Sequence, residues 1–351
     1  MYTKPKYSVK DLVIWTRWEI LGFLVLATVP VVLYHVLGME WLKIPWTPVA
    51  LVGTAVAFMI GFQNNAAYGR IWEARQIWGG IVNASRTFGI MIQDMITNEY
   101  TDEPLTDEEM QEHRRLLLER HFAWLTALRH AMRQPRPWET SQNHVTNREW
   151  QESICTPERH LDLRKELTPL LSQEELERVL SKANQPTAIL FLQSSHLRKL
   201  KERKAIWEFS FLEMEGLVKE LFELQGKSER IKNFPYPRQF ATLGCDFVRV
   251  FVLMLPFALV PEFAKLGTEM SESFPMVSAH FVWLSVPMTA LVAWVFNTMH
   301  RIGTTGENPF EGTVNDVPIS TISRGIEIDL RQQFDCGEIP EAFPALRAVQ
   351  M

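Results

Sequence analysis

The sequence predicts an all-α membrane protein with several spanning helices and a large helical domain outside the bilayer. Two observations predict this class. Long apolar blocks lie near both ends of the 351-residue chain, and the charged stretch between them has helical patterning. An apolar helix of about 20 residues crosses the hydrocarbon core of a bilayer. The alternative is a soluble protein with buried core helices, but a chain this short offers little protein to cover four such blocks.

The first two blocks predict an antiparallel pair of spans. The first runs from about Trp18 to Leu37 and follows a charged N-terminal segment without an obvious cleavage site, so we interpret it as a retained span rather than a signal peptide. Pro30 would kink it, which spans tolerate when neighbours satisfy the freed carbonyl. The second runs from about Trp46 to Phe62, and the loop between the blocks is short.

The last two blocks predict a second pair of spans. The third runs from about Phe240 to Val260, and its Asp246 and Arg249 are three residues apart, so pairing would lower their cost at membrane depth. The fourth runs from about Phe274 to Met299 and is followed by a polar tail.

Charge around the blocks predicts the orientation. Basic residues gather on one side of the expected spans: Lys4, Lys6, Lys10, Arg17, Arg70, Arg75, Arg230, Lys232, Arg238 and Arg301. Because cytoplasmic flanks carry the excess of Lys and Arg, we expect a multi-pass protein of the cell membrane with both termini in the cytoplasm. The expected segments are a cytosolic N-terminal segment (1–17), a transmembrane hairpin (18–62), a cytosolic helical domain (63–238), a second transmembrane pair (239–300) and a cytosolic C-terminal strap and tail (301–351).

The middle segment is too polar to span and has helical texture. Apolar residues recur at helical spacing from Glu108 to Met132 and from Ala205 to Leu224. Ser172, followed by Glu175, predicts a capping box that opens another helix. The stretch from Arg133 to Pro157 is rich in Pro, Asn and Thr and is expected to be a loop.

Composition excludes several functions. The net charge of −5 gives no basic footprint, so no nucleic-acid partner is expected. Cys155, Cys245 and Cys336 lie far apart without metal-ligand spacing. No P-loop, Gly-x-Ser-x-Gly or HExxH pattern occurs, so we expect no enzyme, no catalytic residue, no metal site and no cofactor.

A motif follows the second block directly. The segment Gln63 to Arg86 reads QNNAAYGRIWEARQIWGGIVNASR. It resembles the bestrophin signature, with matches at Asn64, Ala67, Tyr68, Arg70, Trp72, Glu73, Ala74, Arg75, Trp78, Gly79, Asn83, Ser85 and Arg86, and begins with an Asn-rich turn. Gln63 and Ile71 depart from the family pattern, and the insert from about Arg136 to Thr156 matches nothing in it.

The resemblance implies a homopentameric ion channel with one central pore. Its partners would be small inorganic ions, membrane lipid and further copies of the chain. Animal bestrophins are calcium-activated chloride channels, whereas some bacterial members pass cations. A sodium-permeable channel therefore stays open as an alternative, and so does a membrane-anchored scaffold or receptor without transport.

The resemblance places the hydrophobic pore neck at Thr54, Phe58 and Phe62, which recur every four residues on one helix face. Beside them runs a strip of small residues, Gly53, Ala57 and Gly61, which lets helices approach closely. The edge of a Phe ring is partly positive and its face partly negative. Five rings that present edges would favour an anion, and two Phe positions resemble the animal neck, so chloride is the preferred ion.

Other residues follow from the same resemblance. Signature residues expected to support the inner pore are Asn64, Asn65, Arg70, Trp72, Glu73 and Arg75, and the spacing of Arg70 and Glu73 favours an ion pair within the helix. A second, cytosolic constriction falls near Phe209, with Ile206, Leu212 and Glu213 as competitors. Animal members bind calcium through an acidic run, of which only Glu311 and Asp316 remain here, so no calcium site is expected.

Overall fold

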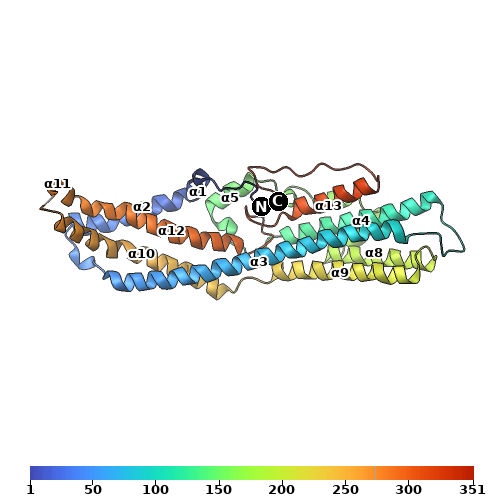
Figure 1. The fold of residues 1–351 in the computed structure, drawn as a ribbon, viewed down its shortest axis with the longest axis horizontal. Coiled ribbons are helices and arrows are strands. Elements are labelled where there is room, and N and C mark those ends of the chain that lie inside the picture. Colours follow the sequence, from blue (N-terminus) through green and yellow to red (C-terminus); the bar gives the residue numbers. More distant parts are fainter. Residues whose placement is uncertain (273) are drawn as a thin grey trace.

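The computed structural model describes residues 1–272 and 274–351, and every regular element in that part of the chain is a helix (Figure 1). Isolated β-bridges at Tyr2–Val349 and Leu346–Val349 tie the two ends of the chain together. The molecule is elongated, and both termini lie near its middle. The predicted all-α class is confirmed.

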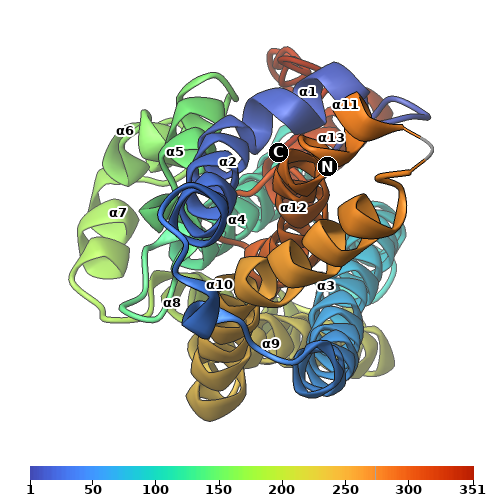
Figure 2. The same cartoon turned by 90° about the vertical axis from the view of Figure 1, so that its left-hand side faces the viewer.

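One end of the molecule holds the apolar helices; we call it the spanning half. Within the described residues, four helical segments are long and apolar enough to cross a membrane. They comprise α2 (Arg17–Val31) with a π-helical turn to Val36, the beginning of α3 (Trp46–Met95), α10 (Arg238–Glu269), and the segment ending in α12 (Ser285–Gly306). Figure 2 looks at the molecule from this end and shows α3, α10, α12 and α2 gathered around one another. A short helix, α1 (Val9–Trp15), precedes α2.

Two of the expected spans differ in detail. The third extends past Val260, because α10 accommodates Pro256 and Pro261 and ends only at Glu269. The fourth is broken at its N-terminal end into α11 (Pro275–Ser278) and a 3-10 turn (Phe281–Leu284) before α12 starts. The predicted pair within α10 is confirmed, with Arg249 Nη1 3.3 Å from Asp246 Oδ1.

The helix α3 joins the two halves of the molecule. Its 50 residues continue without interruption through Gln63–Asn65, so the expected Asn-rich turn is wrong. The reason is that buried positions recur at helical spacing on both sides of this segment, at Ile60, Gln63, Ala67 and Ala74. At 1.5 Å per residue, such a helix is about 75 Å long.

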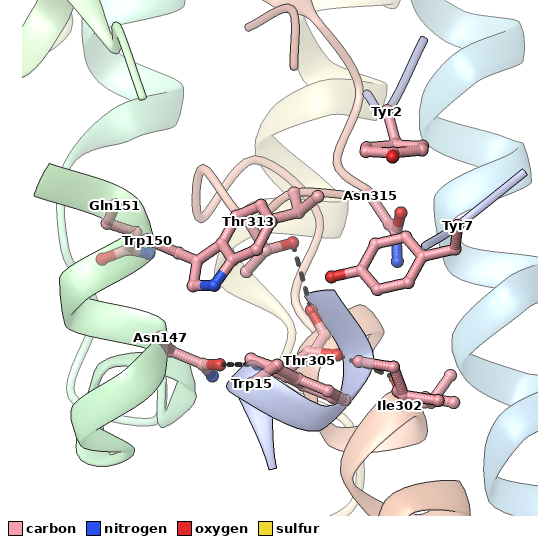
Figure 3. Close-up of a pocket in the computed structure, with 12 residues that line it drawn as sticks. Tyr2, Tyr7, Trp15, Asn147, Trp150, Gln151, Ile302, Thr305, Thr313 and Asn315 are labelled. Carbon is pink, nitrogen blue, oxygen red and sulfur yellow. Dashed lines mark hydrogen bonds between the residues drawn. The ribbon is translucent and has the colours of Figure 1, made fainter. Parts of the chain in front are cut away.

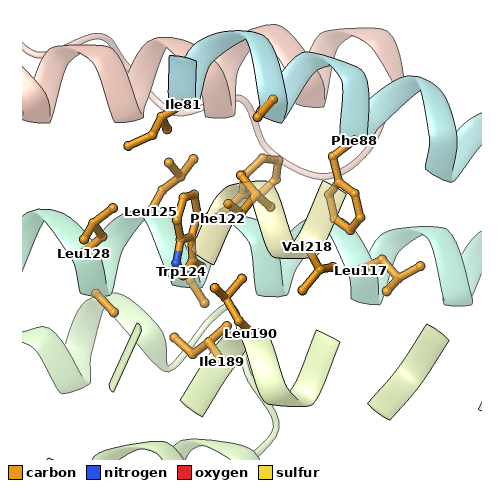
Figure 4. Close-up of a cluster of buried hydrophobic side chains, with 14 of the residues drawn as sticks. Ile81, Phe88, Leu117, Phe122, Trp124, Leu125, Leu128, Ile189, Leu190 and Val218 are labelled. Carbon is orange, nitrogen blue, oxygen red and sulfur yellow. The ribbon is translucent and has the colours of Figure 1, made fainter. Parts of the chain in front are cut away.

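The other half, which we call the distal half, is a helical bundle. There α4 (Asp107–Arg133), α9 (Glu208–Asn233) and α13 (Ile319–Gln333) pack around the second part of α3, and α8 (Gln185–Glu202) packs against α4 and α9. Figure 4 shows its core around Trp124, whose Nε1 donates to Gln225 Oε1 over 2.9 Å. Two short helices, α6 (Leu163–Leu167) and α7 (Gln173–Leu180), flank it, and the predicted capping box at Ser172 and Glu175 is confirmed.

The expected loop between Arg133 and Pro157 is partly wrong. It contains a 3-10 turn (Ser141–Asn143) and α5 (Val145–Glu152), and a further 3-10 turn follows at Pro157–Arg159. The helix forms because Trp150 and its neighbours pack against the N-terminal segment and the last residues of the chain, partners that lie far away in sequence.

Candidate functional site

One face of α3 in the spanning half carries the three residues predicted to form a neck. Thr54, Phe58 and Phe62 share a face because they are four residues apart. The rest of the chain leaves this face uncovered, since Phe58 is 63% and Phe62 73% exposed. The hydroxyl of Thr54 donates to the carbonyl of Ala50 over 3.0 Å, so its proton is used within the helix while its oxygen can still accept. An open aromatic strip of this kind marks a contact with something outside the chain.

The opposite face of α3 packs tightly inside the chain. Val56 and Ile60 are buried in a cluster with residues of α10. Gly53 belongs to that face, because a Cβ at this position would lie 2.7 Å from Cε2 of Phe251. A Cβ at Gly61 would meet nothing within 4 Å. The predicted strip of small residues therefore divides: Gly53 serves packing within the chain, and Gly61 stays open.

The polar residues that follow Phe62 have different surroundings. Gln63 is buried, and its Oε1 lies 3.0 Å from Nδ1 of His300 on α12. Asn64 contacts α12 at Gly303, where a side chain would collide with the Asn64 amide. Asn65 is exposed on the same side as the two Phe residues. Of this trio, only Asn65 is exposed.

Arg70 joins α3 to two other helices by hydrogen bonds to backbone carbonyls. Its Nε donates to the carbonyl of Glu307 over 2.7 Å, and its Nη2 donates to the carbonyls of Phe234 over 2.8 Å and Ile231 over 3.1 Å. The guanidinium thus binds the C-terminal end of α9 and the end of α12, where helices leave carbonyls unpaired. The expected pair with Glu73 is wrong, because Glu73 accepts from Arg230 instead, over 2.6 Å.

Two other signature residues expected to support the inner pore, Trp72 and Arg75, are exposed on α3. Trp72 stacks on Tyr68, with ring centroids 6.4 Å apart and an angle of 13° between the planes. Arg75 is also exposed and approaches the sulfur of Met1 at 3.9 Å. Trp72 and Arg75 therefore lie on the surface of this chain, whereas Arg70 fixes helix positions.

Phe209 lies in the first turn of α9 and is 62% exposed. Its ring rests on Trp207 with centroids 4.7 Å apart, and Trp207 in turn stacks on Tyr100. Among its competitors, Ile206 is buried in the core and cannot line a pore in this arrangement, whereas Leu212 is open.

The two acidic residues of the strap are held by protein groups. Asp316 accepts hydrogen bonds from three backbone N–H groups, those of Phe310, Gly312 and Val317, and from Arg133. Glu311 accepts from the backbone N–H and the hydroxyl of Ser141. Within residues 1–272 and 274–351, no three His, Cys, Asp or Glu side chains are grouped as a metal site would need.

Sequence reasoning named Arg301 only as a basic residue beside the fourth span and missed its buried contacts. This buried residue of α12 pairs with Glu19 of α2 and donates to Thr146 and to Asn147 in the insert, the latter over 3.1 Å. Its guanidinium also lies 4.1 Å from the ring centroid of Trp15. The sequence contains one signal for this pair, Glu19 at the start of the first apolar block, but it does not show which residue pairs with Glu19.

These features define a helical membrane protein in which one long helix keeps an aromatic face open. Residues 8–332 match the family described as "Bacterial/Fungal Bestrophin protein". The chain therefore belongs to the bacterial and fungal bestrophin family, whose members are ion channels rather than enzymes.

Known relatives agree over most of the chain. It is 26% identical over 324 residues to the Salmonella typhimurium voltage-dependent anion channel-forming protein YneE, covering 92% of this chain and 87% of the relative. A protein of the same descriptive name from Ralstonia nicotianae is 27% identical over 285 residues, covering 81% and 76%. The crystal structure of a bacterial bestrophin homologue from Klebsiella pneumoniae shares the fold, with a TM-score of 0.70, 20% identity, and coverage of 92% and 99%.

Proposed function

We propose that the protein is a homopentameric channel whose pore is lined by the open face of α3, and that it passes anions, chloride above all. The observation that best supports this proposal is the strip of Phe58 and Phe62 on α3, which the rest of the chain leaves exposed. Five copies related by one rotation axis would bring their five strips to the same position around that axis, where they would line a common pore. Relatives named as voltage-dependent anion channel-forming proteins support the choice of ion.

The neck would act through dehydration. Two Phe rings per chain, stacked one helical turn apart, would form two apolar constrictions with Thr54 outside them. An ion that enters such a constriction sheds water without gaining replacement ligands, so the pore can close by dewetting. If the ring edges face the axis, their partial positive charge favours an anion.

The rest of α3 would carry the pore onward. Arg70 holds α9 and α12 against α3, so the signature would keep the pore helix in place rather than contact ions. Asn65 would follow the neck as a polar ring. Phe209 would form a second constriction at the distal end of the pore. It lies close to the end of α3, because the backbone N–H of Thr97, just after α3, donates to the carbonyl of Ala205, just before α9. Phe62 and the end of α3 are about 50 Å apart along the helix.

For orientation, we propose that residues 63–238 and both termini face the cytoplasm, with α2, α10, α12 and the start of α3 in lipid. The short segment between α10 and α11 would then be external. A single Cys at Glu269, in otherwise Cys-free protein, should react with an impermeant reagent in intact cells. Labelling at a Cys replacing Gln142 in the insert, without labelling at position 269, would invert this orientation.

One experiment separates the candidate functions. The purified protein is sized by native mass spectrometry and then reconstituted in a planar bilayer under asymmetric potassium chloride. A pentamer whose reversal potential approaches that of chloride supports the proposal. A reversal potential near that of potassium would give the cation channel instead. A stable assembly without conductance would favour the scaffold.

A further inference from the structure

A cavity of about 570 Å³ lies between three segments that are far apart in sequence (Figure 3). They are the N-terminal segment with α1, the helix α5 of the insert, and the end of α12 with the strap that follows it. We call it the aromatic cavity. Its volume is within the range of about 300–1,000 Å³ that is usual for small-molecule sites.

Aromatic rings form its walls. Tyr2, Tyr7, Trp15 and Trp150 all line it, and Figure 3 shows them around one space. The rings of Tyr7 and Trp150 are 6.5 Å apart between centroids, with only 23° between their planes. Trp15 is held in place because its Nε1 donates to Asn147 over 2.7 Å. Flat apolar walls of this kind suit a flat ring, which stacks on their faces.

A buried donor at this cavity has no acceptor. Gln151 is only 7% exposed, and its Oε1 accepts from Arg159 over 3.0 Å, which fixes the amide orientation. Its Nε2 has no hydrogen-bond partner among the described residues, and Figure 3 shows this nitrogen on the side toward Trp150. Buried donors in proteins are nearly always paired, so this one points to a missing acceptor.

Charge around the walls favours an anion. Arg347 lies 5.9 Å from the ring centroid of Trp150, and Arg301 lies 4.1 Å from that of Trp15, although Glu19 balances the latter. Within the described chain, no residue that lines the cavity carries a carboxylate. Burial, followed by the nearby charge of Asp11, raises the pKa of Tyr7 to about 12, so its hydroxyl stays a donor at neutral pH.

We propose that the aromatic cavity binds a small flat aromatic carboxylate, with its ring against Trp150 and Tyr7 and its carboxylate accepting from the Gln151 amide. Binding itself does not depend on the proposed channel function. A functional consequence does, because the cavity is also lined by Thr313, and the strap carries Phe310, whose ring lies 6.3 Å from that of Trp78 on α3. An occupied cavity would then bias the pore helix through the strap.

The test uses the full-length protein in detergent and isothermal titration calorimetry with 2-naphthoate. We expect saturable binding of one molecule per chain, and binding of 2-naphthylmethylammonium weaker by about tenfold or more, since it brings a cation to a site that offers donors. Gln151→Leu should weaken 2-naphthoate binding by about tenfold through loss of the charge-assisted hydrogen bond. Trp150→Leu should weaken it at least as much through loss of stacking. Trp41→Leu, at a residue 78% exposed, is the matched control and should bind like wild type.

Absence of saturable binding to wild type would overturn the proposal, and so would unchanged affinity in Gln151→Leu. If Trp150→Leu shows no thermal transition and is therefore unfolded, Gln151→Leu alone tests the proposal, because it replaces one side chain by another of similar size. Equal affinity for the ammonium probe would refute the carboxylate preference. A bilayer recording with 2-naphthoate comes last: binding without any change in current would separate the site from the channel.

Discussion

Arg133 Nη1 donates to Asp316 Oδ2 over 2.8 Å, and both side chains are at most 2% exposed. The pair ties α4, in the middle of the sequence, to the strap that follows α12. Because the backbone N–H groups of Phe310 and Val317 donate to Oδ1 of the same carboxylate, Asp316 organises the whole turn of the strap.

Replacing this carboxylate should be costly. Asp316→Ala leaves Arg133 buried beside three unpaired N–H groups, and we expect the free energy of unfolding to fall by about 3–5 kcal/mol. Denaturant unfolding of the detergent-solubilised protein measures it. Asp329→Ala is the control, because its pair with Arg86 is exposed and should contribute at most about 1 kcal/mol. Equal effects of the two changes would contradict a structural role for Asp316.

Two glycines of α3 should separate folding from assembly. Gly53→Leu forces a side chain into the ring of Phe251 and should destabilise the chain by about 1–3 kcal/mol. A Cβ at Gly61 meets nothing within 4 Å inside the chain, so we expect Gly61→Leu to leave the thermal unfolding of the monomer near that of wild type and to weaken the pentamer at a close helix contact. Native mass spectrometry and thermal unfolding together distinguish them. A fully stable Gly61→Leu pentamer would place the subunit contact elsewhere.

Glu311 should make stability depend on pH. Burial raises the pKa of this carboxyl from 4.5 to about 7, against the opposing hydrogen bond from Ser141. The folded state therefore binds the proton more tightly than the unfolded state does. Stability is highest below about pH 4.5 for this group and declines as pH rises to about 7, by up to about 3 kcal/mol.

The matched variant for this prediction is Glu311→Gln, which keeps an acceptor for Ser141 and cannot ionise. As the pH rises from 4.5 to 7, the free energy of unfolding of wild type should fall relative to that of the variant. Taking this difference cancels the opposing contribution of His121, whose pKa burial lowers to about 3. A constant difference across that range would show that Glu311 titrates normally.

Patterns within one helix were predictable from the sequence, and contacts between distant segments were not. Helical spacing and charge gave the apolar spans, α4 and the capping box at Ser172. The same spacing placed Phe58 and Phe62 on one face. The partners of Arg70 lie more than 150 residues away, at α9 and α12, so spacing alone favoured the wrong partner, Glu73. The helix α5 in the insert was not predicted for the same reason, since its buried contacts are with the distant ends of the chain.

The neck gives the most direct functional prediction. Phe58→Ala with Phe62→Ala removes both apolar rings, which should widen and wet the path and so raise conductance or open probability. Any preference for anions should weaken, because the ring edges are lost. Phe62→Ala alone should do less, since the ring at Phe58 still obstructs. Single-channel recording under asymmetric potassium chloride measures all three quantities.

Because the rest of the chain does not cover Phe58 and Phe62, a folding defect should not obscure the result of this experiment. The two residues are 63% and 73% exposed, so their truncation removes little packing inside the protomer and the variant should fold. Phe251→Ala is the contrasting control, because this buried ring of α10 fills space against α3 and its loss should cost about 3–5 kcal/mol. A pentameric double variant with wild-type conductance, open probability and selectivity would show that Phe58 and Phe62 do not line the pore.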